Sequence, residues 1–361
     1  MKEKIEILKQ SPIFAFTRAS TEVAHSNFWH WLIDLDKNFI RVFFPNADMN
    51  DFGEHFVKRE QKNRDLTIWN KSGKALVVEN KIKDLPRLEQ LEEYQAKLAS
   101  EFAGGVITGI IKPDFIANKA DWNFVDYKTI ANNISTIANT LNLTDKQKMF
   151  ITEYVENVIG IYEILTELAN ESDSMDLTSC NQLEEIKFAD VAKKLRASMF
   201  KHYLELNITD DSKKLIEGTD WEFRILQGFG QDKNPYVDAR FVKGDKVLGI
   251  QIEGSSFERC IQDYMGDIKN LEKQTKELFE KAVLINWFQR EQTSEDKKHF
   301  IFDKETNMRI SPNYCRHKSE NAKYIKLYQH YTIKDFSFKA LADEILENLI
   351  VASEIIKKGL I

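Results

Sequence analysis

Residues 64–81 have the sequence RDLTIWNKSGKALVVENK, and this segment determines the fold that we predict. Asp65–Trp69 alternates apolar and polar residues, as a half-buried strand does, and Ala75–Glu79 is a mostly apolar run of strand length. Between them lie Asn70–Gly73, which are residues typical of turns. The segment therefore predicts a β-hairpin with a short loop.

The hairpin places Asp65, at the start of its first strand, across from Glu79, at the end of its second. Two neighbouring carboxylates repel each other unless positive charge lies between them. Carboxylate oxygens suit Mg²⁺, which polarises a phosphate and lowers the pKa of a bound water. Lys81 shares a strand face with Glu79 and could stabilise developing charge. Taken alone, Glu79 and Lys81 fit an exposed ion pair, worth well under ~1 kcal/mol, equally well.

The composition is that of a globular protein of one large domain or two, with 361 residues, 42% hydrophobic and 30% charged. Residues 1–10 are charged, and no apolar stretch approaches the ~20 residues of a membrane helix. We therefore expect no signal peptide, no membrane partner and a cytoplasmic location. Cys180, Cys260 and Cys315 form no CxxC pair, which argues against a zinc site or a disulfide framework and favours buried free thiols.

The net charge of −6 argues, for the chain as a whole, against binding nucleic acid. The charge is unevenly distributed, however, because Lys58–Arg87 holds nine basic and four acidic residues, a net charge of +5. Taken alone, such a run is better explained as a solvated surface. Four of its basic residues precede Asp65 and could follow a phosphate backbone: Lys58, Arg59, Lys62 and Arg64.

Helical and strand patterns alternate on both sides of the hairpin. In the first half we expect helices at 21–39, about 86–100 and 130–170, the last with a break near Thr144, and strands at 105–111 and 122–127. In the second half we expect helices at 184–206, 260–281 and 336–358, and strands at 221–227, 236–242, 247–253 and 282–288.

Four elements resemble the PD-(D/E)XK nuclease superfamily in their type and order along the chain. They are a helical motif that begins at Glu22, then Asp65, then the Glu79-Asn-Lys81 run, and last a helical motif that begins at Gln90. Arg64 stands where the name of the superfamily has proline. Gln90-Leu-Glu-Glu-Tyr94 resembles the QxxxY element of its exonuclease branch, and a spacing of four puts both side chains on one helix face. Glu22-Val-Ala-His-Ser26 resembles the first helix of a bacterial subgroup.

The resemblance covers roughly residues 15–115 and implies a restriction-endonuclease-like α/β core, with a mixed central sheet flanked by helices. It implies a Mg²⁺ site, with Mn²⁺ able to substitute, held by Asp65, Glu79 and Glu22, with Lys81 catalytic. DNA is the implied substrate. His25, Gln90 and Tyr94 are the implied contacts to DNA or to a metal-bound water.

We expect two domains: a nuclease core with a helical extension at 1–175, and an α+β region at 176–361. Residues 236–253 resemble the first hairpin, with Asp238 and Glu253 in place of its carboxylates, but no lysine follows Glu253. An unrelated hairpin is a better explanation than a decayed second copy. In either case this region would bind substrate or a partner.

A Mg²⁺-dependent deoxyribonuclease, acting in restriction, in defence against foreign DNA or in repair, is the favoured function. Cutting both strands with one site per chain favours a homodimer. The alternative is an inactive nuclease-like fold that binds nucleic acid or a protein. Intact Asp65, Glu79 and Lys81 argue against it. The flanking motifs argue against a purely structural protein with an accidental motif.

Overall fold

The computed structural model describes residues 2–17, 22–61, 64–82, 88–112, 116, 118–170, 173–229, 234–264, 277, 287, 300–301 and 324–361. The chain divides into two compact units. The first unit comprises Met1–Glu171 and Ser179–Leu195, and the second comprises Ser172–Thr178 and Arg196–Ile361. The boundary that we predicted at 175/176 thus lies inside a short segment of the second unit, after which the chain returns to the first.

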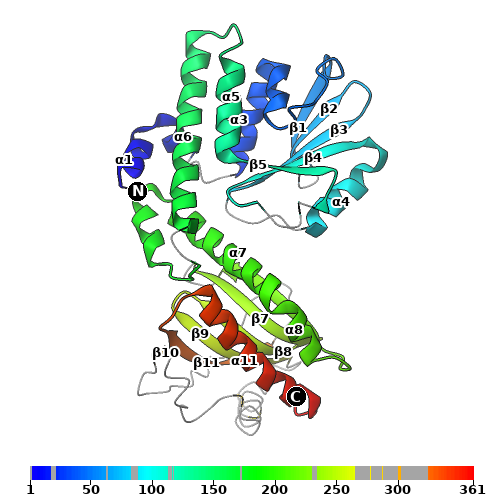
Figure 1. Cartoon of the computed structure of the whole chain (residues 1–361), viewed down its shortest axis with the longest axis vertical. Coiled ribbons are helices and arrows are strands. Elements are labelled where there is room, and N and C mark those ends of the chain that lie inside the picture. Colours follow the sequence, from blue (N-terminus) through cyan, green and yellow to red (C-terminus); the bar gives the residue numbers. More distant parts are fainter. Residues whose placement is uncertain are drawn as a thin grey trace. The chain divides into compact units, whose positions relative to one another are not determined.

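The first unit contains a five-stranded mixed sheet with the order β1-β2-β3-β4-β5 (Figure 1). Its strands are β1 (His55–Gln61), β2 (Arg64–Asn70), β3 (Ala75–Lys81), β4 (Phe102–Gly109) and β5 (Trp122–Asp126). The pairs β1–β2 and β2–β3 are antiparallel, whereas β3–β4 and β4–β5 are parallel. The prediction of an α/β fold with a mixed central sheet is confirmed.

Both faces of this sheet are covered because the residues of β3 alternate between two apolar environments. Ala75 and Val77 pack with Leu91 of α4 (Leu88–Leu98) in one buried cluster. The intervening residues of β3 face the opposite side, where α3 (Glu22–Leu35) packs on β1, β2 and β3. All of β3 except Lys81 is buried, as expected for a central strand.

The long helical region of the first unit has the break that we predicted. It comprises α5 (Tyr127–Ala138) and α6 (Asp145–Asn170), which pack against each other. Thr144 and Gln147 exchange hydrogen bonds at the start of α6, where the Gln147 amide donates to the Thr144 hydroxyl at 3.3 Å. The remaining helical elements are α1 (Lys2–Gln10), α2 (Pro12–Thr17), η1 (Lys37–Val42), η2 (Ala99–Glu101) and η4 (Thr178–Ile186).

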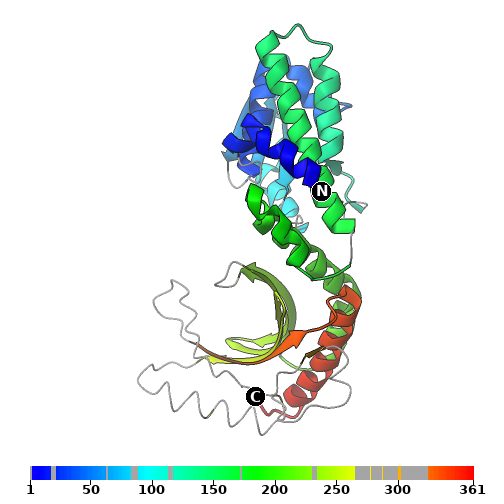
Figure 2. The same ribbon diagram turned by 90° about the vertical axis from the view of Figure 1, so that its left-hand side faces the viewer.

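The second unit contains a six-stranded sheet with the order β10-β11-β9-β8-β7-β6. The strands are β6 (Glu222–Phe229), β7 (Pro235–Lys243), β8 (Lys246–Glu253), β9 (Ser256–Tyr264), β10 (Phe300–Ile301) and β11 (Tyr324–Ile333). The sheet is curved, and α11 (Phe338–Lys357) lies against its convex side (Figure 2). α7 (Ala189–Asn207) and α8 (Thr209–Leu215) complete the described helices.

One helix prediction is wrong at its start, because Cys260 lies in β9 rather than in a helix over 260–281. Phe257 and Ile261 belong to the core beneath α11, so the apolar residues of this segment alternate as they do in a strand. Residues 261–264 of that predicted helix also lie in β9, and the remainder, except Glu277, lies outside the described residues. So does the strand predicted at 282–288, except Trp287, which is buried.

The predicted hairpin of the second half is present as β7 and β8, with Asp238 paired to Gln251. Every pair in its sheet is antiparallel among the described strands, unlike the first sheet. The similarity to the first hairpin therefore does not extend to the topology of the sheet. Within the described part of the chain, no helix is both long and apolar enough to cross a membrane.

Candidate active site

The hairpin of β2 and β3 brings Asp65 and Glu79 together, as the sequence predicts. Leu66 pairs with Val78, and the same register places Asp65 opposite Glu79. The Asp65 carboxylate also accepts a hydrogen bond from the backbone amide of Asn80, with 2.6 Å between Oδ2 and N. The connecting turn is fixed by Asn70, whose side-chain oxygen accepts from the Lys74 amide at 2.9 Å.

Glu79 is the centre of the candidate site, and only 1% of its surface is exposed. Its Oε1 lies 2.8 Å from Lys81 Nζ and accepts a hydrogen bond from Gln90 Nε2 at 2.7 Å. Its Oε2 is buried and makes no geometric hydrogen bond with the described residues, although the Tyr94 hydroxyl acts on the Glu79 carboxylate and lowers its pKa. A buried carboxylate oxygen without a close donor is costly, so this atom could accept a positively charged ligand.

The electrostatics of the site reflect the crowding of carboxylates. Burial, and next the charge of Glu79, raise the pKa of Asp65 to about 7. Burial likewise raises the pKa of Glu79, against the opposing effect of Lys81. For Lys81, burial is the largest single effect and lowers the pKa, but the charge and hydrogen bond of Glu79, together with the charges of Glu22 and Asp65, outweigh it and the pKa is raised. Lys81 therefore stays an ammonium ion at neutral pH and cannot serve as a base.

Glu22 and the two QxxxY residues adjoin this cluster. Glu22, in the first turn of α3, is among the charges that raise the pKa values of Asp65 and Glu79. Gln90 Nε2 also donates to the Tyr94 hydroxyl at 2.6 Å. Tyr94 is buried, with 1% of its surface exposed, and burial raises its pKa. Gln90 and Tyr94 thus hold Glu79 in place from α4.

Asn80 is a residue of the site that the sequence analysis missed. Its side chain is fully buried, donates to the backbone carbonyl of Glu22 at 2.8 Å and accepts from the Tyr127 hydroxyl. Its backbone amide donates to the Asp65 carboxylate. Asn80 therefore connects α3, α5 and β2 to the end of β3. The available signal was an uncharged polar residue inside an otherwise apolar strand, between Glu79 and Lys81.

His25 is not placed to contact a substrate in this structure. It is 1% exposed, and its Nδ1 lies 2.8 Å from the Tyr154 hydroxyl. Its ring meets the Tyr127 ring edge-on, with 5.1 Å between centroids. The contacts of this histidine, as far as they are described, are those of an aromatic core residue.

The four basic residues upstream of Asp65 differ in their exposure to solvent. Lys58 and Arg59 are exposed on β1, the edge strand of the sheet. Arg64 is only 2% exposed, so its guanidinium would have to move outward to reach a phosphate. Lys62 lies outside the described residues. The structure thus presents two of the four predicted phosphate contacts at the surface.

The residues present fit a divalent cation held by two carboxylates. No three His, Cys, Asp or Glu side chains in the described ranges are arranged to hold a metal ion by themselves. Mg²⁺ needs fewer, since it commonly binds one or two carboxylates and keeps several waters. When all four groups are ionised, Glu22, Asp65, Glu79 and Lys81 leave two negative charges uncompensated. Glu79 Oε2, which makes no geometric hydrogen bond with the described residues, is an atom that such an ion could bind.

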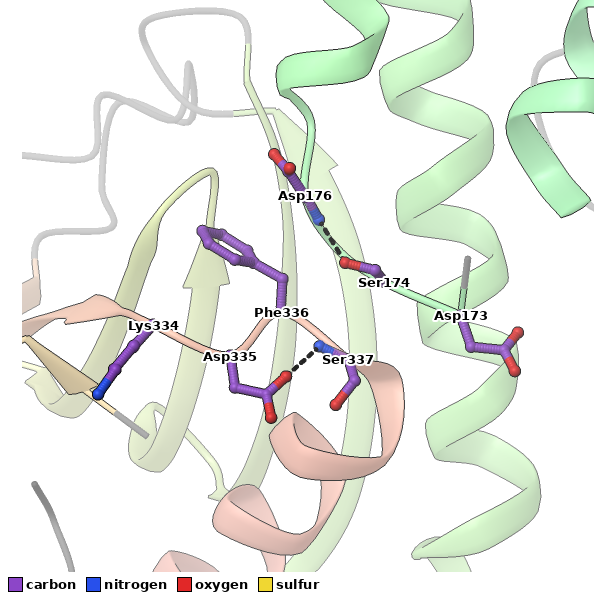
Figure 3. A pocket seen from close by; sticks show the side chains of 7 residues that line it. All are labelled: Asp173, Ser174, Asp176, Lys334, Asp335, Phe336 and Ser337. Atoms are coloured by element: carbon purple, nitrogen blue, oxygen red, sulfur yellow. Dashed lines mark hydrogen bonds between the residues drawn. The ribbon is translucent and has the colours of Figure 1, made fainter. Parts of the chain in front are cut away.

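The second unit has an open pocket that is a weaker candidate (Figure 3). It is lined by Asp173, Ser174, Asp176, Lys334, Asp335, Phe336 and Ser337. The three carboxylates point in different directions in Figure 3, and Asp335 accepts from the Ser337 amide at 2.9 Å. These contacts are typical of a turn and of the start of a helix. The lining residues therefore give no indication of a catalytic or binding function.

Comparison with known proteins adds no assignment. No protein-family model, no curated protein and no solved structure matches this chain. The resemblance to the PD-(D/E)XK superfamily therefore depends on the motifs and geometry described above. The homodimer stays a prediction.

Proposed function

We propose that this chain is a divalent-metal-dependent nuclease that hydrolyses phosphodiester bonds in DNA, and that its first unit has a restriction-endonuclease-like core. The buried carboxylate of Glu79 carries the proposal. One of its oxygens is held by Lys81 and Gln90, and the other lacks a described partner beside the second carboxylate, Asp65. A surface ion pair does not account for this arrangement, because Glu79 is 1% exposed.

Asp65 and Glu79 are the residues that would hold the metal ion. Such an ion, when bound, polarises the phosphate and lowers the pKa of water. Asp65 is anchored by the Asn80 amide, and Glu79 by Gln90, so both carboxylates are held before a ligand arrives. Glu22 adds negative charge from α3. Its place as a third ligand stays a prediction.

Lys81 would act through its charge. Its raised pKa keeps the ammonium ion protonated, so it stabilises negative charge on the phosphate rather than accepting a proton. A fixed cation of this kind typically contributes about 10²–10³-fold to the rate. Lys58 and Arg59, exposed on the edge strand, would contact the phosphate backbone beyond the scissile bond.

A cleavage assay tests the proposal. The purified protein is incubated with plasmid and with single-stranded DNA, in Mg²⁺ or in a chelator. Cleavage should require the metal and should fall at least ~10²-fold in both Asp65→Asn and Lys81→Met. Two exposed residues supply matched controls: Asp51→Asn, and Lys97→Met on α4, whose partner is Glu93.

The outcomes separate the candidate functions. Equal cleavage by wild type and both site variants would identify a contaminating nuclease and refute the proposal. DNA binding without cleavage, in Mg²⁺ and in Mn²⁺, would instead favour the inactive, nucleic-acid-binding alternative. Loss of cleavage in the control variants would show that the site variants act through the fold.

A further inference from the structure

The sheet face that carries Asp65 and Glu79 extends to an exposed strip on the edge strand β1, formed by Phe56 and Lys58, whereas Thr67, between Trp69 and Asp65, is fully buried. The register pairs Phe56 with Trp69 and Lys58 with Thr67, and alternation places Trp69, Thr67 and Asp65 on the same face. Because α4 packs on β3 and β4, it leaves the β1 end of this face open. Trp69 follows Asp65 by four residues on β2, which separates the two by roughly 13 Å of strand.

The strip presents a flat aromatic surface. Phe56 is 49% exposed, the only phenylalanine with that much exposure among the described side chains. Its ring stacks on Trp69 with an interplanar angle of 9° and 5.8 Å between centroids. Lys58 Nζ lies 5.3 Å from the centre of the Phe56 ring. An exposed aromatic face beside an ammonium ion suits a planar, negatively charged ligand.

The charge around the strip fits a polyanion. In 55–61 and 64–74 the acidic residues are Glu60 and Asp65. The exposed cations of these ranges are Lys58, Arg59, Lys71 and Lys74. This local excess stands out in a chain whose net charge is −6.

We propose that Phe56, Lys58 and Trp69 form a stacking site for an unpaired nucleotide at the edge of the sheet, on the face that carries Asp65. In a duplex each base is already stacked on its neighbours, so only an unpaired base can offer its face to Phe56. The substrate is therefore single-stranded DNA or a duplex with a single-stranded segment. The relation of this site to the scissile phosphate rests on the proposed nuclease function, but the binding itself does not.

Binding in a chelator tests the inference separately from catalysis. Dye-labelled single-stranded DNA and a blunt duplex of the same sequence are titrated with the full chain, and fluorescence anisotropy gives each Kd. Phe56→Ala should weaken single-strand binding by about 5- to 150-fold, and Phe56→Tyr should retain it. Phe56→Leu keeps apolar bulk without a π-face and should lose most of the affinity. Phe150→Ala is the matched control, because Phe150 on α6 is 46% exposed.

Thermal melts first establish that the Phe56 variants are folded. Each binding result then either supports or overturns the proposed stacking site. Undiminished single-strand binding by both Phe56→Leu and Phe56→Ala would overturn the inference, as would an equal loss on the blunt duplex. Failure of the wild type to bind the single strand would also overturn it. Specific binding that depends on Phe56, without metal-dependent cleavage, would support the stacking site and refute the nuclease.

Discussion

Substitution of Asp65 by asparagine should change the pH dependence of stability in the metal-free protein. The pKa of Asp65 is raised from 3.8 to about 7 in the folded chain, first by burial and then by Glu79. Between these two pH values the folded protein holds a proton that the unfolded chain has released. Stability therefore falls as pH rises through this window, and the full penalty is present above about pH 7.

The magnitude follows from the same change in pKa. A pKa raised from 3.8 to about 7 corresponds to about 4 kcal/mol of lost stability at alkaline pH. Asparagine keeps an oxygen that can accept from the Asn80 amide but carries no charge. The stability of Asp65→Asn relative to wild type should therefore increase by up to about 4 kcal/mol between roughly pH 4 and pH 8.

Denaturant unfolding in a chelator measures this difference, because titrating groups that do not interact with Asp65 are common to both proteins and cancel. Asp51→Asn, at an exposed position, should show no such trend. Adding Mg²⁺ near pH 8 at about 100 times its Kd should stabilise the wild type by about 2.7 kcal/mol, and Asp65→Asn much less. A wild-type-to-variant difference that is independent of pH would refute the crowding of Asp65 against Glu79.

Three further substitutions test the supports of the site. Asn80→Ala should lower the free energy of unfolding, measured with denaturant, by roughly 2–5 kcal/mol, because the Glu22 carbonyl and the Tyr127 hydroxyl lose this partner. A loss under ~1 kcal/mol would contradict the proposed role of Asn80 in connecting these elements. Gln90→Ala should weaken Mg²⁺ binding about 10–100-fold by calorimetry while the fold persists, and unchanged affinity would show that Gln90 does not position Glu79. Gly105→Ala should lower the melting temperature by an amount equivalent to about 1–3 kcal/mol, because its Cβ would lie 2.3 Å from the Trp122 ring, and an unchanged melting temperature would mean that the ring can move.

Local sequence signals predicted the parts of the site that lie close together in the chain. The turn residues Asn70–Gly73 fix the hairpin, and the helix that follows β3 returns Gln90 to Glu79. Asn80 could not be interpreted in the same way, because its side-chain partners come from α3 and α5, far away in sequence. Which carbonyl a buried amide will reach depends on tertiary packing that no local pattern contains.

Four described strands, β1, β9, β10 and β11, were not predicted, and for β1 and β9 the physical reason is clear. β1 has the sequence HFVKREQ, and its charges, which suit an edge strand because they discourage pairing with other chains, made it appear as a solvated basic run. β9 has apolar residues at positions that fit either a strand or the start of a helix, and its pairing with β8 decided in favour of the strand. Edge position and partner choice are both properties of the assembled sheet.

The carboxylate at position 79 is difficult to explain by stability alone. Val77, two residues earlier on the same strand face, packs with the buried cluster beneath α4, and an apolar residue at 79 would extend that cluster. Instead, Lys81 and Gln90 are both directed at Glu79, and burial still raises its pKa. Lys81 and Gln90 contact one oxygen of Glu79, and the other makes no geometric hydrogen bond with the described residues, which is what the proposed metal ligand requires. Burial and the charge of Glu79 also raise the pKa of Asp65, so both carboxylates lower the stability of the protein when they are ionised, and a divalent cation bound between them would relieve both costs.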